Sequence, residues 1–164
     1  MQKKSLPHHL AALWFADIAG YSKRGLEDER GALELVELLQ TLSRTTVQRY
    51  EGRVVKFFGD AVLAEFPSTE MAVRAAAVLS KVYAEQSIKT GRGHYLRIGV
   101  HLGDVAVDTD GDLYGDGVNA AARIQAAVDP GQVVVSDDVW RQIRGRQGFR
   151  FERLGNRDLK GVGL

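Results

Sequence analysis

Two short apolar runs separated by Gly59 and Asp60 constrain the fold more than any other feature of the sequence. The runs, residues 53–58 (RVVKFF) and 61–66 (AVLAEF), are rich in β-branched and aromatic side chains. A two-residue loop that contains glycine between two such runs is a strong signal for a β-hairpin. The sequence therefore predicts two antiparallel strands with Asp60 in the turn that joins them.

Strands and helices are expected on both sides of this hairpin, from apolar runs and from apolar residues spaced by three and four. In chain order they are a strand at 10–18, a helix at 27–50, the hairpin, a helix capped by Ser68 that continues to 86, a strand at 95–107, a helix at 115–128, a strand at 132–136, a helix at 137–143 and a strand at 149–154. The β-α-β-β-α-β order at the start predicts an α+β domain: a ferredoxin-like βαββαβ core with helices on one face, and additional C-terminal strands and helices.

Composition limits the domain count and the partners. A chain of 164 residues, 45% of them hydrophobic, suits one domain over 1–164, with 1–9 as an N-terminal tail. Lysines and arginines (22) balance aspartates and glutamates (21), so we expect no nucleic acid partner and no membrane contact by this segment. The chain has no cysteine and no long apolar stretch, which favours a cytoplasmic location. The apolar ending LKGVGL favours a piece of a larger protein, with regulatory domains or a membrane anchor elsewhere.

Asp17 and Asp60 are the first candidate functional residues. Asp17 lies within an apolar run near the end of the first predicted strand. A buried unpaired carboxylate costs several kcal/mol, on the order of what a domain can spare, so Asp17 requires a cation. If the two strands are neighbours, the two carboxylates can bridge hard divalent cations such as Mg²⁺. Taken alone, Asp60 is equally typical of a turn former.

Lys56 and the segment DTDGDLYGDGVNAAARI supply further candidates. Strict alternation places Lys56 on one face with Val54 and Phe58, where an edge or snorkelling lysine is an equally good interpretation. Asn119 and Arg123 are four residues apart, so they share one face of the predicted helix and can both reach an anion. A solvated helix face is the alternative interpretation.

Two other interpretations of that segment are weaker. A calcium loop beginning at Asp108 would need glycine where Leu113 stands and glutamate where Asn119 stands. A dinucleotide fingerprint beginning at Gly115 would need a preceding strand, and a polar, turn-rich stretch precedes it instead.

Four segments in order, FADIAGYS, VVKFFGDAVLAEF, RIGVHLGD and DLYGDGVNAAARI, together resemble the catalytic domain of class III adenylate and guanylate cyclases. The resemblance covers about residues 11–160, and each of its motifs is weak alone. It implies a homodimer with two shared active sites that converts ATP into cyclic AMP and pyrophosphate with two Mg²⁺ or Mn²⁺ ions.

The resemblance also implies a role for each matching residue. The implied assignments are metal binding by Asp17, Ile18 and Asp60; adenine recognition by Lys56 and Asp112; ribose orientation by Asn119; transition-state stabilisation by Arg123; and phosphate contacts by Lys160 and the backbone of Ala19, Gly20, Tyr21 and Ser22.

The chain departs from the animal enzymes at Asp104, where they carry a phosphate-contacting arginine, and in a shorter arm between Gly103 and Asp112, which bacterial members share. Three alternatives stay open at this point. A guanylate cyclase would need a glutamate-like acceptor in place of Lys56, a non-catalytic cyclase-like module would lack catalytic residues, and a diguanylate cyclase would carry a GGDEF-type turn where FFGDA stands.

Overall fold

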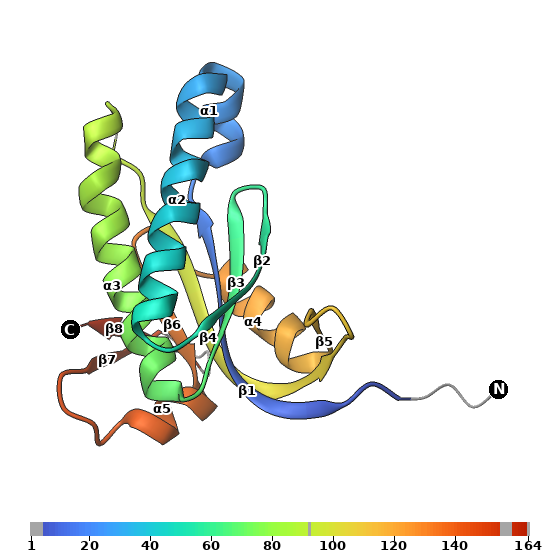
Figure 1. The fold of residues 1–164 in the computed structure, drawn as a ribbon. Coiled ribbons are helices and arrows are strands. Elements are labelled where there is room, and N and C mark those ends of the chain that lie inside the picture. The colour runs from blue at the N-terminus through green and yellow to red at the C-terminus, as the bar shows by residue number, and fades with distance from the viewer. Residues whose placement is uncertain (1–4, 92, 155–158, 164) are drawn as a thin grey trace.

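The computed structural model describes residues 5–91, 93–154 and 159–163 and shows one mixed sheet with helices on both faces (Figure 1). The strands are β1 (His8–Ile18), β2 (Arg53–Phe58), β3 (Ala61–Phe66), β4 (Leu96–Val107), β5 (Leu113–Tyr114), β6 (Val133–Ser136), β7 (Arg150–Arg153) and β8 (Leu159–Gly163). The helices are α1 (Tyr21–Glu27), α2 (Glu29–Arg49), α3 (Thr69–Ser87), α4 (Asp116–Ala126) and α5 (Asp137–Ile143), with a 3-10 turn, η1, at Ile88–Thr90. The strand order is β2-β3-β1-β4-β6-β8-β7, and β5 pairs with β4. The predicted α+β class and ferredoxin-like core are confirmed.

β1 occupies the centre of the core, antiparallel to β3 on one side and to β4 on the other. Its side chains alternate between two separate hydrophobic clusters. Trp14 packs in the cluster under α2, α3 and α5, whereas Leu13 packs in the cluster under α4. This alternation explains why residues 10–18 are almost continuously apolar, because both faces of a central strand are buried.

The face that carries α2 and α3 holds the larger cluster. Leu35 and Leu39 of α2 pack there with Leu79 and Tyr83 of α3, all with at most 1% of their surface exposed. The Tyr83 hydroxyl donates to the carbonyl oxygen of Leu35 at 3.1 Å, which satisfies the one polar atom of a buried phenol. The two long helices are thereby joined side by side over the sheet (Figure 1).

The two helices of the predicted core, α2 and α3, share one face as expected, and α4, one of the additional C-terminal helices, covers the opposite face. It packs closely because side chains are absent where α4 meets β4. A Cβ on Gly99 would lie 2.5 Å from the backbone nitrogen of Gln125, and a Cβ on Gly117 would lie 2.6 Å from the carbonyl oxygen of Asp104. Glycine at both places lets the helix backbone rest directly on the strand.

The hairpin has the predicted boundaries but not the predicted alternation. A register shift between Val54 and Lys56 interrupts the pairing of β2 with β3. As a result Val54 and Phe57 pack toward the larger cluster, while Phe58 stacks on Phe15 beside the α4 cluster. A β-bulge of this kind moves the following side chains to the other face. The prediction that Val54 shares a face with Lys56 and Phe58 is therefore wrong.

The remaining differences are at element ends. The helix expected at 27–50 corresponds to α2, and a separate helix, α1, precedes it. The extended backbone of Asp28 ends α1, and its side chain accepts from Gly31 N to cap α2. Ser68 caps α3 through Met71 N, as expected. α1, β5 and β8 are absent from the elements predicted by the sequence pattern, and β1 begins at His8, within the expected tail.

Candidate functional site

Asp17 and Asp60 lie together at one end of the sheet. Asp17 pairs with Ala61 in the register of β1 with β3, and Ile18 N donates to the backbone oxygen of Asp60 at 3.2 Å. Burial, and next the negative charge of Asp17, raise the pKa of Asp60 above its usual value. A neighbouring carboxylate that raises the pKa of Asp60 marks a place where a cation would be favoured. The structure thus brings the two expected metal ligands together. Ile18, whose carbonyl is the third expected ligand, directly follows Asp17.

Arg97 of β4 supplies a cation that the sequence analysis did not identify. Its Nε donates to Asp17 Oδ1 at 2.9 Å and its Nη2 donates to Asp17 Oδ2 at 2.7 Å. This hydrogen bonding to Asp17 is the main reason that the pKa of Arg97 is raised. The requirement of Asp17 for a cation is met here by a guanidinium. A signal was present, because Arg97 is the only charged side chain in the otherwise apolar run YLRIGV.

Lys56 and Asp112, 56 residues apart in sequence, form an ion pair with 2.9 Å between Nζ and Oδ2. The Lys56 ammonium also lies 4.8 Å from the ring centre of Phe58 and 5.6 Å from that of Tyr114. Partial burial would raise the pKa of Asp112, but hydrogen bonds from Lys56 and from Leu113 N lower it below its usual value. The contact with Lys56 thus favours the Asp112 carboxylate, and two aromatic rings lie beside the lysine.

Asn119 and Arg123 lie on α4, and both side chains are exposed. Among the described residues, neither side chain makes a hydrogen bond or an ion pair with Asp17 or Asp60. α4 is positioned by its close contact with β4, so its exposed face is held rigidly. One chain therefore does not bring the α4 pair into contact with the carboxylate pair.

Lys160 lies elsewhere. It is 7% exposed on β8, pairs in register with Val135 and Arg153, and places its Nζ 5.3 Å from the ring centre of Trp140. In the part of the chain that the structure describes, it makes no hydrogen bond or ion pair with either pair of candidate residues. Its expected role in phosphate binding stays a prediction.

In the segment Ala19 to Ser22, Ala19 and Gly20 form the turn after β1, and Tyr21 and Ser22 begin α1. Gly20 has a φ of 75°, a left-handed conformation that glycine adopts without strain. Ala19 N donates to the carbonyl oxygen of Tyr95 at 2.9 Å, which fixes the turn against the start of β4. The turn is thus placed where it can meet a ligand held by Asp17 and Asp60.

Asp104 lies near the other end of β4, where it pairs in register with Leu10. Its carboxylate accepts from His8 Nδ1 at 2.7 Å, and both side chains are more than half exposed. Asp104 therefore belongs to a surface ion pair, far along the sheet from Asp17.

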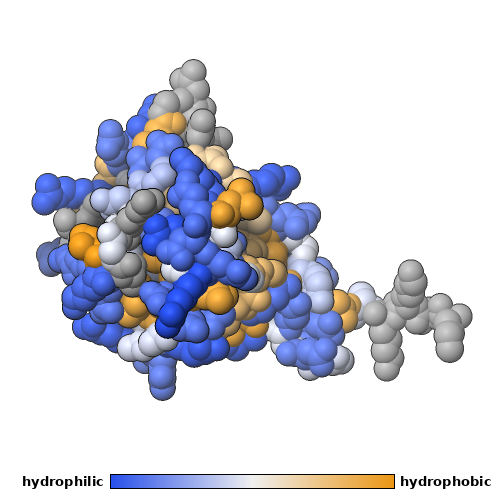
Figure 2. Space-filling view, turned by 90° about the horizontal axis from the view of Figure 1, so that it is seen from above, coloured by the Kyte–Doolittle hydropathy of each residue, from blue (hydrophilic) through white to orange (hydrophobic). Residues whose placement is uncertain are grey.

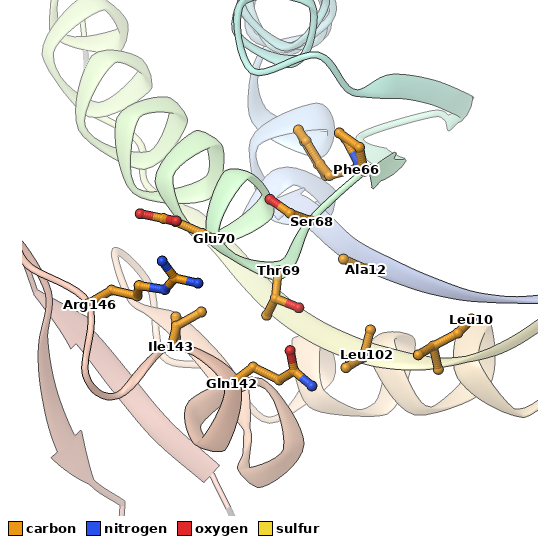
Figure 3. Close-up of a pocket in the computed structure, with 11 residues that line it drawn as sticks. Leu10, Ala12, Phe66, Ser68, Thr69, Glu70, Leu102, Gln142, Ile143 and Arg146 are labelled. Atoms are coloured by element: carbon orange, nitrogen blue, oxygen red, sulfur yellow. The ribbon is translucent and has the colours of Figure 1, made fainter.

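A cavity of about 320 Å³ lies at that other end of the sheet, between β1, the start of α3 and α5 (Figure 3). Its lining combines apolar side chains with Glu70, Gln142 and Arg146, and includes no candidate site residue. The surface seen from above in Figure 2 is mainly hydrophilic, with separate hydrophobic groups. The candidate residues thus lie outside this cavity.

Comparisons with known proteins show the family. The chain belongs to the adenylate and guanylate cyclase catalytic domain family, whose profile matches residues 4–163. A relative named putative adenylate cyclase 3, from Rhizobium meliloti, is 40% identical over 99% of this chain and 28% of its own length. The chain thus spans about a quarter of that relative, and 6% of a matching adenylate cyclase from Mycosarcoma maydis.

Solved structures share the fold. The adenylate/guanylate cyclase/hydrolase of Silicibacter pomeroyi is 30% identical, with a TM-score of 0.76 over 95% of this chain and 96% of its own. A monomeric double mutant of the guanylyl cyclase domain of RhoGC from Blastocladiella emersonii superimposes with a TM-score of 0.83 at 21% identity, over 97% and 96% of the two chains.

Two general properties follow from the family and the fold. Cyclase catalytic domains of this class are lyases that act on nucleoside triphosphates and generally use divalent metals. In the described part of the chain, no helix is long and apolar enough to cross a membrane, and no three or more histidine, cysteine, aspartate or glutamate side chains form a cluster able to hold a metal. Asp17, Asp60 and the Ile18 carbonyl are oxygen donors of the kind that Mg²⁺ prefers, so they fit a site that substrate and water complete.

Proposed function

We propose that this domain is an adenylate cyclase that converts ATP into 3′,5′-cyclic AMP and pyrophosphate. The observation that carries the proposal is the ion pair of Lys56 with Asp112, which places a donor beside an acceptor. Adenine presents an acceptor at N1 and a donor at its 6-amino group, whereas guanine presents the opposite polarity at both positions. A site whose polar groups match one base rejects the other, because mismatched groups stay unpaired. The name of the relative from Rhizobium meliloti supports the same choice.

In the proposed mechanism Asp17, Asp60 and the Ile18 carbonyl hold two divalent cations. Bound there, the cations supply Lewis acidity that makes the ribose 3′-hydroxyl a better nucleophile and neutralises charge on the triphosphate. Asn119 orients the ribose, and Arg123 stabilises the charge that develops as the 3′-oxygen attacks the α-phosphorus and pyrophosphate leaves. The Ala19 to Ser22 turn, next to Asp17, contacts the phosphates through its backbone.

We also propose that two copies of the chain build the site. Asn119 and Arg123 are exposed on α4, and in the described residues neither side chain hydrogen bonds or pairs with Asp17 or Asp60 of its own chain. In a twofold dimer, residues of one surface patch meet those of its counterpart, so α4 of one chain can face Asp17 and Asp60 of the other. The site is incomplete without the second copy, and two equivalent sites result.

An assay of both products tests the substrate. The wild-type domain, with Mg²⁺ or Mn²⁺, is expected to form cyclic AMP from ATP in preference to cyclic GMP from GTP. The double variant Lys56→Glu/Asp112→Cys should lower ATP use and shift the preference toward GTP, while Lys81→Glu on the far side of α3 serves as a charge-reversal control. Preferred cyclic GMP formation by the wild type would identify a guanylate cyclase. Absence of both products would identify a non-catalytic module.

A mixing experiment tests the shared site. Asp17→Ala and Arg123→Ala chains should each be nearly inactive alone, because every site contains one lesion. In a mixed dimer one site collects both lesions and the other is intact, so equal mixing should restore roughly a quarter of wild-type activity. A mixture that exchanges subunits, as shown by differently tagged chains, and gains no activity contradicts the shared site.

A further inference from the structure

The contact between Arg97 and Asp17 is built into the sheet. The two residues are register partners on the antiparallel strands β1 and β4, so their backbones cannot separate without breaking the centre of the sheet. Both Asp17 oxygens accept from the guanidinium, at 2.9 and 2.7 Å. A carboxylate offers about four acceptor positions, and a bidentate arginine occupies one on each oxygen.

The positive charge of Arg97 opposes the binding of a second cation at Asp17. Asp17 and Asp60 contribute two negative charges and Arg97 one positive charge, so the group carries a net charge of −1. Arginine stays protonated throughout the working pH range, so Arg97 cannot become neutral to admit a metal. A divalent cation bound to Asp17 would lie about 2 Å from a carboxylate oxygen. It would therefore stand beside a guanidinium of like charge.

The Arg97 side chain can move away from this contact into solvent, whereas the Asp17 side chain cannot. The Arg97 side chain is 31% exposed and that of Asp17 is 16% exposed. A long arginine side chain can turn its head into solvent while its backbone stays in the strand. The aspartate is short, and its position at the end of β1 is fixed.

We propose that Arg97 closes the carboxylate site in the metal-free domain, and that a divalent cation binds by displacing its guanidinium from Asp17. Arg97 is then a positioning residue: it holds the Asp17 carboxylate through both oxygens, and it competes with metal until substrate arrives. This inference rests on the proposed metal-binding role of Asp17 and Asp60. It predicts that the nucleotide-free domain binds metal weakly because of Arg97, and not because its ligands are misplaced.

The test measures Mn²⁺ binding to the nucleotide-free domain, with free Mn²⁺ followed by electron paramagnetic resonance. Competition between two cations for one carboxylate is a coupling free energy, so Arg97→Gln should tighten Mn²⁺ binding by about tenfold. Arg97→Lys keeps a charge without the bidentate fork and should bind with intermediate affinity. The double variant Asp17→Asn/Arg97→Gln should not show this increase in Mn²⁺ affinity, because the competition takes place at Asp17.

Arg53→Gln is the matched control. Arg53 and Glu65 are also register partners on neighbouring strands, with Arg53 Nε 2.8 Å from Glu65 Oε1, but they lie away from Asp17. Removing this pair should leave Mn²⁺ affinity unchanged. Thermal unfolding in EDTA reports folding separately: Arg97→Gln should unfold at a lower temperature than wild type and should gain more from added Mn²⁺.

The outcomes separate this inference from the proposed function. If Arg97→Gln binds Mn²⁺ no more tightly than wild type while Asp17→Asn binds it more weakly, the metal site stands and the competition is wrong. If Asp17→Asn has the affinity of wild type, the metal assignment of the proposed function fails, and the inference fails with it.

Discussion

The two faces of the sheet are covered to different extents. On one face α2, α3 and α5 enclose a large cluster in which Trp14, Leu79 and Tyr83 are fully buried. On the other face α4 covers a smaller cluster, and Phe15 and Val55 at its edge are only partly buried. Phe58 and Tyr114, beside this second face, are 40% and 44% exposed.

The candidate residues follow this division. Asp17 and Arg97 pair on the α4 side of the sheet, Lys56 lies there because of the bulge in β2, and α4 itself carries Asn119 and Arg123. In the proposed function the heavily covered face supplies stability and the sparsely covered face supplies the chemistry, although Lys160 lies against Trp140 beside the larger cluster. Substitutions on the two faces should therefore separate the effects on folding from those on turnover.

The largest effect is expected for Asp17→Ala on the α4 side. Loss of a metal ligand should lower turnover by about 10³-fold or more, which exceeds the usual loss of one transition-state donor. The fold should persist, because Arg97 is partly exposed and can turn to water. Cyclic nucleotide formation and circular dichroism measure the two properties. Turnover within tenfold of wild type would contradict the metal role.

The next effect is expected on the heavily covered face. Leu79→Ala removes a side chain with 0% exposure and should lower the free energy of unfolding by about 2–5 kcal/mol. Turnover per folded molecule should not change below the melting temperature. Leu33→Ala on α2, where the leucine is 55% exposed, is the control and should stay within about 0.5 kcal/mol. Urea denaturation measures both variants, and equal losses would contradict the division between buried and exposed positions.

Gly99→Ala tests how α4 is held. The new Cβ would meet the Gln125 backbone at 2.5 Å, so α4 must move away from β4 and shift Asn119 and Arg123. A displacement near 1 Å can cost about 10²-fold in rate. Gly25→Ala, where no atom lies within 4 Å of the new Cβ, is the matched control. The rate constant at saturating ATP is the measurement; an unchanged rate would show that α4 tolerates the shift.

The smallest effect is expected for Asp60→Asn, measured as a change of melting temperature in EDTA. Because the pKa of Asp60 is raised in the folded protein, by burial first and by Asp17 second, the folded state binds its proton more tightly than the unfolded state. The protonated Asp60 therefore stabilises the folded state fully below pH 3.8, the usual pKa of an aspartate. This stabilisation is lost as the pH rises through the pKa of Asp60 in the folded protein. Asp60→Asn should therefore raise the melting temperature at pH 7.5 and not below pH 3.8. An equal shift at both pH values would point to packing instead.

The sequence predicted those parts of the fold that depend on local pattern. The hairpin boundaries follow from turn chemistry at Gly59 and Asp60, and Ser68 was identified as a cap because capping is local. The α1 segment, YSKRGLE, has no apolar period, and LKGVG in β8 contains two glycines. The bulge after Val54 depends on how β2 meets β3, so alternation alone could not reveal it.

The candidate residues could be proposed from the sequence, whereas their contacts could not. The need of Asp17 for a cation was evident from its apolar surroundings, yet its partner Arg97 is 80 residues away in sequence. Register in the sheet sets that pairing, and register follows from the whole core. In the same way, Lys56 and Asp112 were matched by resemblance, whereas the aromatic rings of Phe58 and Tyr114 around the ammonium came from the structure.

The central position of β1 bears on how the chain folds during synthesis. β1 is made first, but its partner β4 includes Arg97, which follows Asp17 by 80 residues. At about 5–20 residues per second, the ribosome needs roughly 4–16 s to add those residues. During that interval the apolar strand that contains Trp14 lacks its second neighbour and is exposed to aggregation. Such non-local pairing also slows refolding of the free domain, and chaperones that bind extended apolar segments would recognise β1.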